Sequence, residues 1–124
     1  MKPKLLSIVE VGGYPDLTPR YEALGFKVFG AKTQRKALQC FKAERPEVIV
    51  AEFIFTPDFR DRISNLDTLA TQIQAHRPDA HLILLYEPED QASLERFRAR
   101  IEPTACFPHP VEIEALLQAV AQAR

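Results

Sequence analysis

Several side chains that could bind or transfer a charged group follow hydrophobic segments of this chain. The segments are LLSIV (5–9), PEVIVAEFIF (46–55), HLILLY (81–86) and ACF (105–107), and the side chains at or after their ends are Glu10, Glu52, Tyr86 and His109. Two carboxylates, a phenol and an imidazole in one place could transfer a proton, hold a cation or bind a polar ligand. The simpler interpretations are a solvated strand end for Glu52, a ring at the rim of the core for Tyr86 and a turn residue for His109.

The elements that must position these side chains alternate between two kinds of pattern. Short apolar runs predict strands, and amphipathic segments between them predict helices. The predicted strands are 5–9, 27–31, 46–55, 81–86 and 105–107, and the predicted helices are 19–24, 34–44, 65–76, 90–101 and 111–123. This (βα)5 order predicts an α/β fold, in which right-handed crossovers build a parallel sheet with helices on both faces.

Local signals support several helix boundaries. Thr18 followed by Pro19 predicts an N-cap with proline in the first turn, and Gly25 predicts a left-handed residue after that short helix. Ser64 and Asp67 have the spacing of an approximate capping box. The glycine pair at 12–13 lacks a phosphate-loop motif, so we interpret it as a flexible connection.

Composition limits the function classes. The 124 residues suit one domain, spanning 1–124, and a net charge of −1 gives no basic field for nucleic acid or an anionic membrane. No segment has the length and hydrophobicity of a membrane span or the pattern of a signal peptide, so a cytoplasmic protein is expected. The cysteines and histidines lack metal-ligand spacing, and no nucleophile-base pair is visible, so we expect no metal, no cofactor and no enzymatic activity.

The side chains after the strands should meet at one edge of the sheet. In an open parallel sheet, ligands bind outside the carboxyl ends of the strands, where the connecting loops converge. Glu10, Glu52, Tyr86 and His109 all fall at this edge. The sequence therefore predicts either a functional site there or the remains of one.

Three segments make the chain similar to response-regulator receiver domains of two-component signalling. They are PEVIVAEF, RPDAHLILLYEPED and ACFPHPVEIEALLQAV. The resemblance implies a CheY-like, flavodoxin-like fold with strand order 2-1-3-4-5. It also implies a phosphoacceptor site with two acids for Mg²⁺ after the first strand, an aspartate ending the third, a hydroxyl ending the fourth, and lysine-proline after the fifth.

This chain departs from that pattern at most positions. The positions implied by the resemblance are occupied by Glu10, Val11, Glu52, Tyr86, His109 and Pro110. Only one acid of the Mg²⁺ pair is retained, and glutamate places its carboxylate about 1 Å beyond the reach of aspartate, a displacement that can cost about 10²-fold in a reaction that depends on positioning. We therefore expect a degenerate pseudo-receiver that does not depend on phosphorylation.

The expected function is that of a protein-interaction module in a signalling pathway. One alternative is a small-molecule-binding domain that uses the edge of the sheet at the strand ends as its pocket. A second is an unconventional phosphoacceptor at Glu52. A third is that the negative charge of Glu52 mimics the phosphorylated state. The resemblance makes the fourth helix, fifth strand and fifth helix the candidate partner or homodimer surface. Arg96 and Arg100 on this surface would pair with Glu112 or Glu114 of a second copy, or with an acidic partner; the simpler interpretation is a solvated helix face. The long stretch 55–65, with Phe55, Phe59, Arg60 and Arg62, is a lid, a partner loop or an insertion.

Overall fold

The computed structural model describes residues 2–55 and 64–123 and contains a five-stranded parallel sheet of order β2-β1-β3-β4-β5. Its strands are β1 (Lys4–Ile8), β2 (Lys27–Ala31), β3 (Val48–Phe53), β4 (His81–Tyr86) and β5 (Ala105–Pro108). Its helices are α1 (Thr18–Ala23), α2 (Gln34–Glu44), α3 (Asp67–His76), α4 (Gln91–Arg98) and α5 (Ile113–Gln122), with a short 3-10 turn at Pro88–Asp90. The predicted doubly wound (βα)5 architecture and strand order are confirmed.

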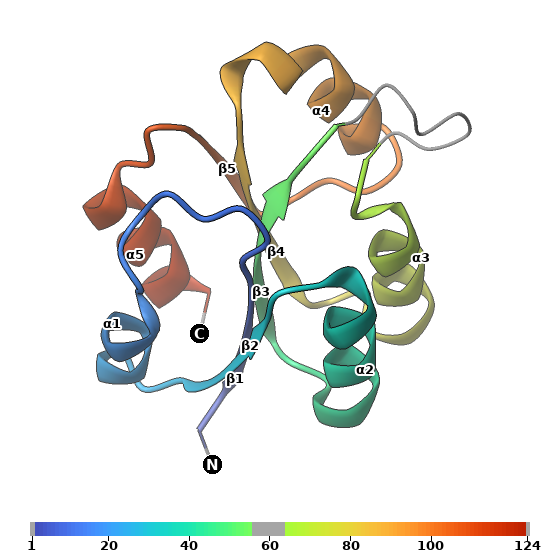
Figure 1. The fold of residues 1–124 in the computed structure, drawn as a ribbon. Helices are drawn as coiled ribbons and strands as arrows, with labels where there is room; N and C mark the ends of the chain where they lie inside the picture. The colour runs from blue at the N-terminus through green and yellow to red at the C-terminus, as the bar shows by residue number, and fades with distance from the viewer. Residues whose placement is uncertain (1, 56–63, 124) are drawn as a thin grey trace.

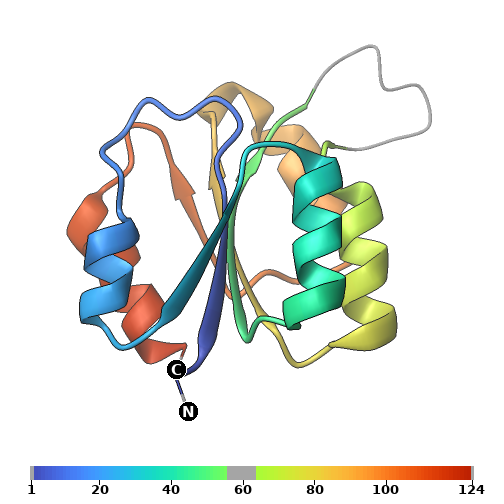
Figure 2. The same ribbon diagram turned by 60° about the horizontal axis from the view of Figure 1, so that its bottom comes forward.

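Helices cover both faces of the sheet. Helices α1 and α5 lie on one face, and α2, α3 and α4 lie on the other (Figures 1 and 2). Two apolar clusters fill these layers, one on each side, and β3 is buried along its whole length. Successive side chains of a strand point to opposite faces, so Val50 packs toward α1 and α5 while Ala51 packs toward α2 and α3.

The first helix begins late and is capped differently from the prediction. Its N-cap is Leu17, and Thr18 is already helical, because the Asp16 carboxylate accepts a hydrogen bond from the Thr18 N–H at 3.0 Å and holds the preceding turn. The predicted Thr18 N-cap is therefore wrong. Gly25 has the expected left-handed conformation, with φ of 99°. The helix has only six residues, so the 9–17 segment crosses the sheet as a loop.

The Ser64 and Asp67 pair forms the predicted contacts but starts its helix later. The Asp67 carboxylate accepts from the Ser64 N–H and hydroxyl, each at 3.1 Å, while the Ser64 oxygen accepts from the Leu66 N–H at 3.0 Å. Regular helix begins at Asp67 rather than at residue 65. The pair thus organises the turn that leads into α3.

Helix α4 ends three residues before its predicted end. It stops at Arg98, and the N–H groups of Arg100 and Ile101 both bond to the Phe97 carbonyl in a tighter turn. Pro103 accounts for this end, because a proline disfavours helical conformation in the residue before it and lacks the N–H that a continuing helix needs. Within the described ranges, no helix is long and apolar enough to cross a membrane.

Candidate functional site

The centre of the site is the Glu52 carboxylate, which is held by backbone N–H groups. Glu52 Oε1 accepts from the N–H groups of Glu10 and Val11, the latter at 2.9 Å, and Oε2 accepts from the Gly12 N–H at 3.0 Å. The side chain is only 4% exposed. Hydrogen bonds from N–H groups stabilise a charged acceptor, so this arrangement offsets the cost of burying a carboxylate. We call the three N–H groups of residues 10–12 the amide nest.

The amide nest depends on the glycine pair that follows β1. Gly12 and Gly13 have φ angles of 82° and 96°, which residues with a side chain rarely adopt. Successive N–H groups in such a turn point to one concave side and form an anion-binding nest. The glycines therefore have a defined conformation rather than the flexible one we expected, and the anion they cradle is a side chain of the same protein.

Glu10 supplies the nest with an N–H but directs its own carboxylate elsewhere. Its Oε2 accepts hydrogen bonds from Gln34 Nε2 at 3.0 Å and from Asn65 Nδ2. Gln34 is the first residue of α2, and Asn65 lies just before α3. The Glu10 side chain thus lies on the α2–α3 side, with its charge matched by amide donors.

Asn65 connects the two acidic positions, and the sequence analysis did not single it out. Its Nδ2 donates to the Glu52 carbonyl oxygen at 2.9 Å as well as to Glu10, and its Oδ1 accepts from the Ile54 N–H at 2.8 Å. Its own N–H bonds to the Ile54 carbonyl at 3.0 Å. Such an asparagine fixes the end of β3 and the loop after it in place of a strand partner.

The four predicted side chains do not form one cluster. The Tyr86 ring packs with the apolar cluster beneath α2, α3 and α4, whereas Glu52 follows Val48 and Val50 on the opposite face of the sheet. The His109 N–H donates to the Tyr86 carbonyl at 2.9 Å, and the His109 ring lies 5.9 Å, centroid to centroid, from the ring of Tyr14. The strand ends converge as expected, but their side chains diverge to different layers.

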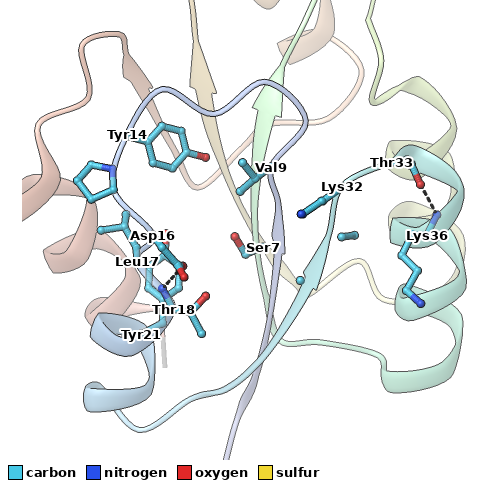
Figure 3. A pocket seen from close by; sticks show the side chains of 13 residues that line it. Ser7, Val9, Tyr14, Asp16, Leu17, Thr18, Tyr21, Lys32, Thr33 and Lys36 are labelled. Carbon is cyan, nitrogen blue, oxygen red and sulfur yellow. Dashed lines mark hydrogen bonds between the residues drawn. The ribbon is translucent and has the colours of Figure 1, made fainter.

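Tyr14 is a second residue that sequence reasoning missed. Burial and the nearby Glu52 charge raise the pKa of its hydroxyl well above the usual value, so the phenol is neutral. Figure 3 shows the hydroxyl turned toward the inside of the β1–α1 loop. The ring and the loop together cover the side of the sheet where Glu52 is buried.

The residues at this corner do not suit Mg²⁺. The Glu52 and Glu10 carboxylates already accept hydrogen bonds from N–H donors, which a cation would have to displace, and Val11 offers an apolar side chain that is 79% exposed. Mg²⁺ requires several oxygen ligands in octahedral geometry. Among the residues that the structure describes, no group of three or more histidines, cysteines or acids is placed to hold a metal ion.

The candidate interface residues have contacts within the chain. Arg96 and Arg100 are both exposed, but Arg100 follows the end of α4 and lies 3.8 Å from the Asp67 carboxylate of α3, while the Arg96 guanidinium lies 5.8 Å from the Phe55 ring centroid. Glu114 accepts from Arg20 at 2.9 Å. Phe59, Arg60 and Arg62, from the 55–65 stretch, lie outside the described residues. A role in partner binding for Arg96, Arg100, Glu112 and Glu114 stays a prediction.

Comparison with known proteins identifies the fold. No family model and no curated protein matches the sequence. Among solved structures, the non-phosphorylated HemR receiver domain from Leptospira biflexa is similar with a TM-score of 0.76 at 20% identity, covering 98% of this chain and 94% of that one. The chemotaxis response regulator CheY4 of Vibrio cholerae gives 0.75 at 16% identity over 100% of both chains. A response regulator receiver domain protein from Clostridium thermocellum gives 0.74 at 18% identity, over 98% and 93%. The chain therefore has the fold of response-regulator receiver domains.

Proposed function

We propose that this chain is a pseudo-receiver, a signalling module that binds a protein partner without being phosphorylated. The observation that carries the proposal is the buried Glu52 carboxylate, with both oxygens bound by the amide nest. In this arrangement the carboxyl group at the end of β3 is a side chain of the protein itself and needs no modification to occupy the amide nest. The link between β3 and the loop after β1 therefore does not depend on a transferred phosphoryl group.

The same contacts argue against phosphoryl transfer to Glu52. A carboxylate that attacks a phosphoryl donor must expose one oxygen in line with the leaving group, and its reaction depends on positively charged groups that balance the transferred charge. Glu52 exposes almost no surface, and the neighbouring acid, Glu10, is bound to Asn65 and Gln34. The His109 ring lies beside the Tyr14 ring at an angle of 34°, whereas the resemblance implies a lysine at that position. The module is accordingly proposed to have no catalytic activity of its own.

Incubation with acetyl phosphate and Mg²⁺, followed by intact-mass analysis, tests this proposal. The expected result is an unmodified chain, because both Glu52 carboxylate oxygens are already hydrogen-bonded and the described residues contain no group of acids, histidines or cysteines placed to hold a metal ion. A phosphorylatable receiver domain treated in parallel shows that the reagent is active. A stoichiometric phosphoryl adduct that is absent from the Glu52→Gln variant would identify Glu52 as an acceptor and contradict the proposal.

The surface formed by α4, β5 and α5 is the first candidate for the partner contact. Arg96 and Arg100 are exposed at one end of this surface, and Arg98 between them pairs with Glu95 at 3.3 Å and Glu102 at 2.7 Å. The charge of Arg98 is therefore balanced locally. Exposed arginines are suited to bidentate contacts with carboxylates of a partner or a second copy.

Charge reversal tests this surface. The double variant Arg96→Glu with Arg100→Glu should reduce self-association, measured by light scattering, or the capture of a partner, and should leave the circular dichroism spectrum unchanged. Arg35→Glu with Lys42→Glu is the matched control, because it makes the same change in charge at two exposed positions of α2. Equal behaviour of the two double variants would remove this surface from consideration.

A further inference from the structure

A cavity of about 680 Å³ lies beside the β1–β2 edge of the sheet, and its lining includes Tyr14, whose hydroxyl is close enough to Glu52 for the carboxylate to raise its pKa. Its floor is formed by β1 and β2, one wall by the 14–18 segment and α1, and the other by the start of α2 (Figure 3). Pockets that bind small molecules usually have volumes of roughly 300–1,000 Å³ and mostly apolar linings. This cavity has both properties, since Val9, Leu17 and two tyrosine rings contribute to the lining.

Short side chains and a short helix keep this space open. Ser7 of β1 and Gly30 of β2 are register partners, so the two smallest side chains of these strands lie next to each other on the floor. A Cβ atom built at Gly30 meets no other atom within 4 Å. Because α1 begins only at Thr18, no helical turn covers the ends of these two strands. The cavity is thus a consequence of several independent sequence features.

Two hydroxyl groups in the lining lack hydrogen-bond partners. Tyr21 is 2% exposed, and within the part of the chain that the structure describes its hydroxyl makes no hydrogen bond. The hydroxyl of Ser7 is likewise without a partner among these residues. Among the described residues, neither oxygen belongs to the fully buried polar atoms that lack a partner, so both hydroxyls border the open space of the cavity, where a ligand or water can form a hydrogen bond with them.

The charges around the cavity favour an anion with one charge. Lys32 and Lys36 line the α2 side, and within residues 2–55 and 64–123 neither ammonium group has an ion-pair partner. Figure 3 shows the Lys32 ammonium group directed toward the cavity. The first turn of α2, capped by Thr33, adds the positive end of a helix dipole. The Asp16 carboxylate on the opposite wall and the Glu52 carboxylate near Tyr14 add two negative charges, which balance the two lysines and disfavour a dianion relative to a monoanion.

We propose that this cavity binds a small organic monocarboxylate with a flat apolar body. The body lies between the tyrosine rings and the floor at Ser7 and Gly30, and the carboxylate lies at the start of α2 near Lys32. The hydroxyl groups of Tyr21 and Ser7 orient the ligand. This site is separate from the amide nest and does not depend on the proposed pseudo-receiver function.

Titration with 2-naphthoate, followed by ¹H–¹⁵N correlation spectra of the whole chain, tests the proposal. We expect a dissociation constant below about 1 mM, as a ligand of this size with one charge contact would reach. Shifts should concentrate at residues 14–18 and 30–36. The neutral isostere 2-naphthamide and the dianion 1-naphthyl phosphate should each bind at least about tenfold more weakly, since one loses the charge-assisted contact and the other is repelled by Asp16.

Two variants locate the site. Gly30→Leu should abolish 2-naphthoate binding by filling the floor, and its spectrum without ligand shows whether the fold is kept. Lys32→Gln should weaken binding at least about tenfold, whereas Lys27→Gln should not, because Lys27 is an exposed lysine at the start of β2 and lies outside the cavity lining. The proposal is wrong if the dissociation constant of 2-naphthoate is about 1 mM or higher. It is also wrong if the folded Gly30→Leu variant, or the Lys32→Gln variant, binds 2-naphthoate as tightly as the original chain does. Binding of 2-naphthamide or 1-naphthyl phosphate as tight as that of 2-naphthoate would contradict it as well.

Discussion

The two sides of the loop that follows β1 are built in opposite ways. On one side, residues 10–12 close around the Glu52 carboxylate, and both of its oxygens accept hydrogen bonds from N–H groups. On the other side, the 14–18 segment borders a cavity with an unpartnered tyrosine hydroxyl and two unpaired lysines among the described residues. A receiver fold usually offers its polar groups at the first of these places. Here the Glu52 carboxylate occupies the first place. The polar groups that are available to a ligand line the cavity at the second.

The length of the Glu52 side chain accounts for the filled corner. The additional methylene of Glu52, compared with aspartate, lets its carboxylate reach the N–H groups of the neighbouring loop. Once those N–H groups are bound by Glu52, they are not available as donors to a phosphate. The loop then continues across the sheet without a helix until Thr18, which leaves the β1–β2 flank uncovered.

Glu52→Gln should produce the largest change in stability. The glutamine amide can accept hydrogen bonds only through its oxygen, so its NH₂ group faces N–H donors and at least one of them stays unsatisfied. Loss of charge-assisted hydrogen bonds and an orphaned buried donor predict a decrease of about 2–4 kcal/mol in the free energy of unfolding, measured by urea denaturation.

Glu87→Gln is the control for this prediction. Glu87 also follows a strand end, but it is exposed, and a surface substitution of this kind usually changes stability by less than about 0.5 kcal/mol. Similar small effects of both substitutions would mean that the amide nest contributes nothing to stability. The hydrogen bonds of Glu52 would then not distinguish the corner around the amide nest from the open β1–β2 flank in stability.

Two glycine-to-alanine substitutions compare the two sides of the loop directly. Gly12→Ala places a Cβ on a residue with φ of 82° and should destabilise the chain by about 1–2 kcal/mol. Gly30→Ala adds a methyl group to a regular strand with open space around it, so it should leave stability unchanged or increase it by up to about 1 kcal/mol. Thermal unfolding of both variants provides the measurement, and destabilisation by Gly30→Ala would show that the floor of the cavity is closed in solution.

The sequence was sufficient for the fold because its elements alternate clearly. Strands such as HLILLY are uniformly apolar, and the helices between them carry apolar stripes, so element order and sheet topology followed from the pattern and the resemblance. Boundaries were less accurate where a neighbouring side chain or proline decided them. Asp16 moved the start of α1, and Pro103 shortened α4.

The site was only partly predictable for a geometric reason. Strand ends are placed by topology, but the layer that a side chain enters is set by strict alternation, which puts Glu52 and Tyr86 on opposite faces. Alternation along β3 and β4 was available in the sequence and would have separated these two residues. The role of Asn65 was not available, because an asparagine in a loop before a helix is common and its partners come from distant segments.

The smallest expected effect concerns the exposed pair that joins α1 to α5. Arg20 donates to both Glu114 oxygens, at 2.9 and 3.2 Å, with side chains that are 52% and 74% exposed. Exposed pairs of this kind are worth about 0.2–1 kcal/mol, so a double-mutant cycle with Arg20→Ala and Glu114→Ala should give a coupling energy in that range. Binding of 2-naphthoate should be unchanged in both variants, because neither residue lines the cavity. A larger coupling energy, or weaker binding of 2-naphthoate, would mean that the Arg20–Glu114 pair is needed to keep α1 in place. The position of α1 beside the cavity would then depend on this exposed pair rather than on the buried contacts of Leu17 and Tyr21.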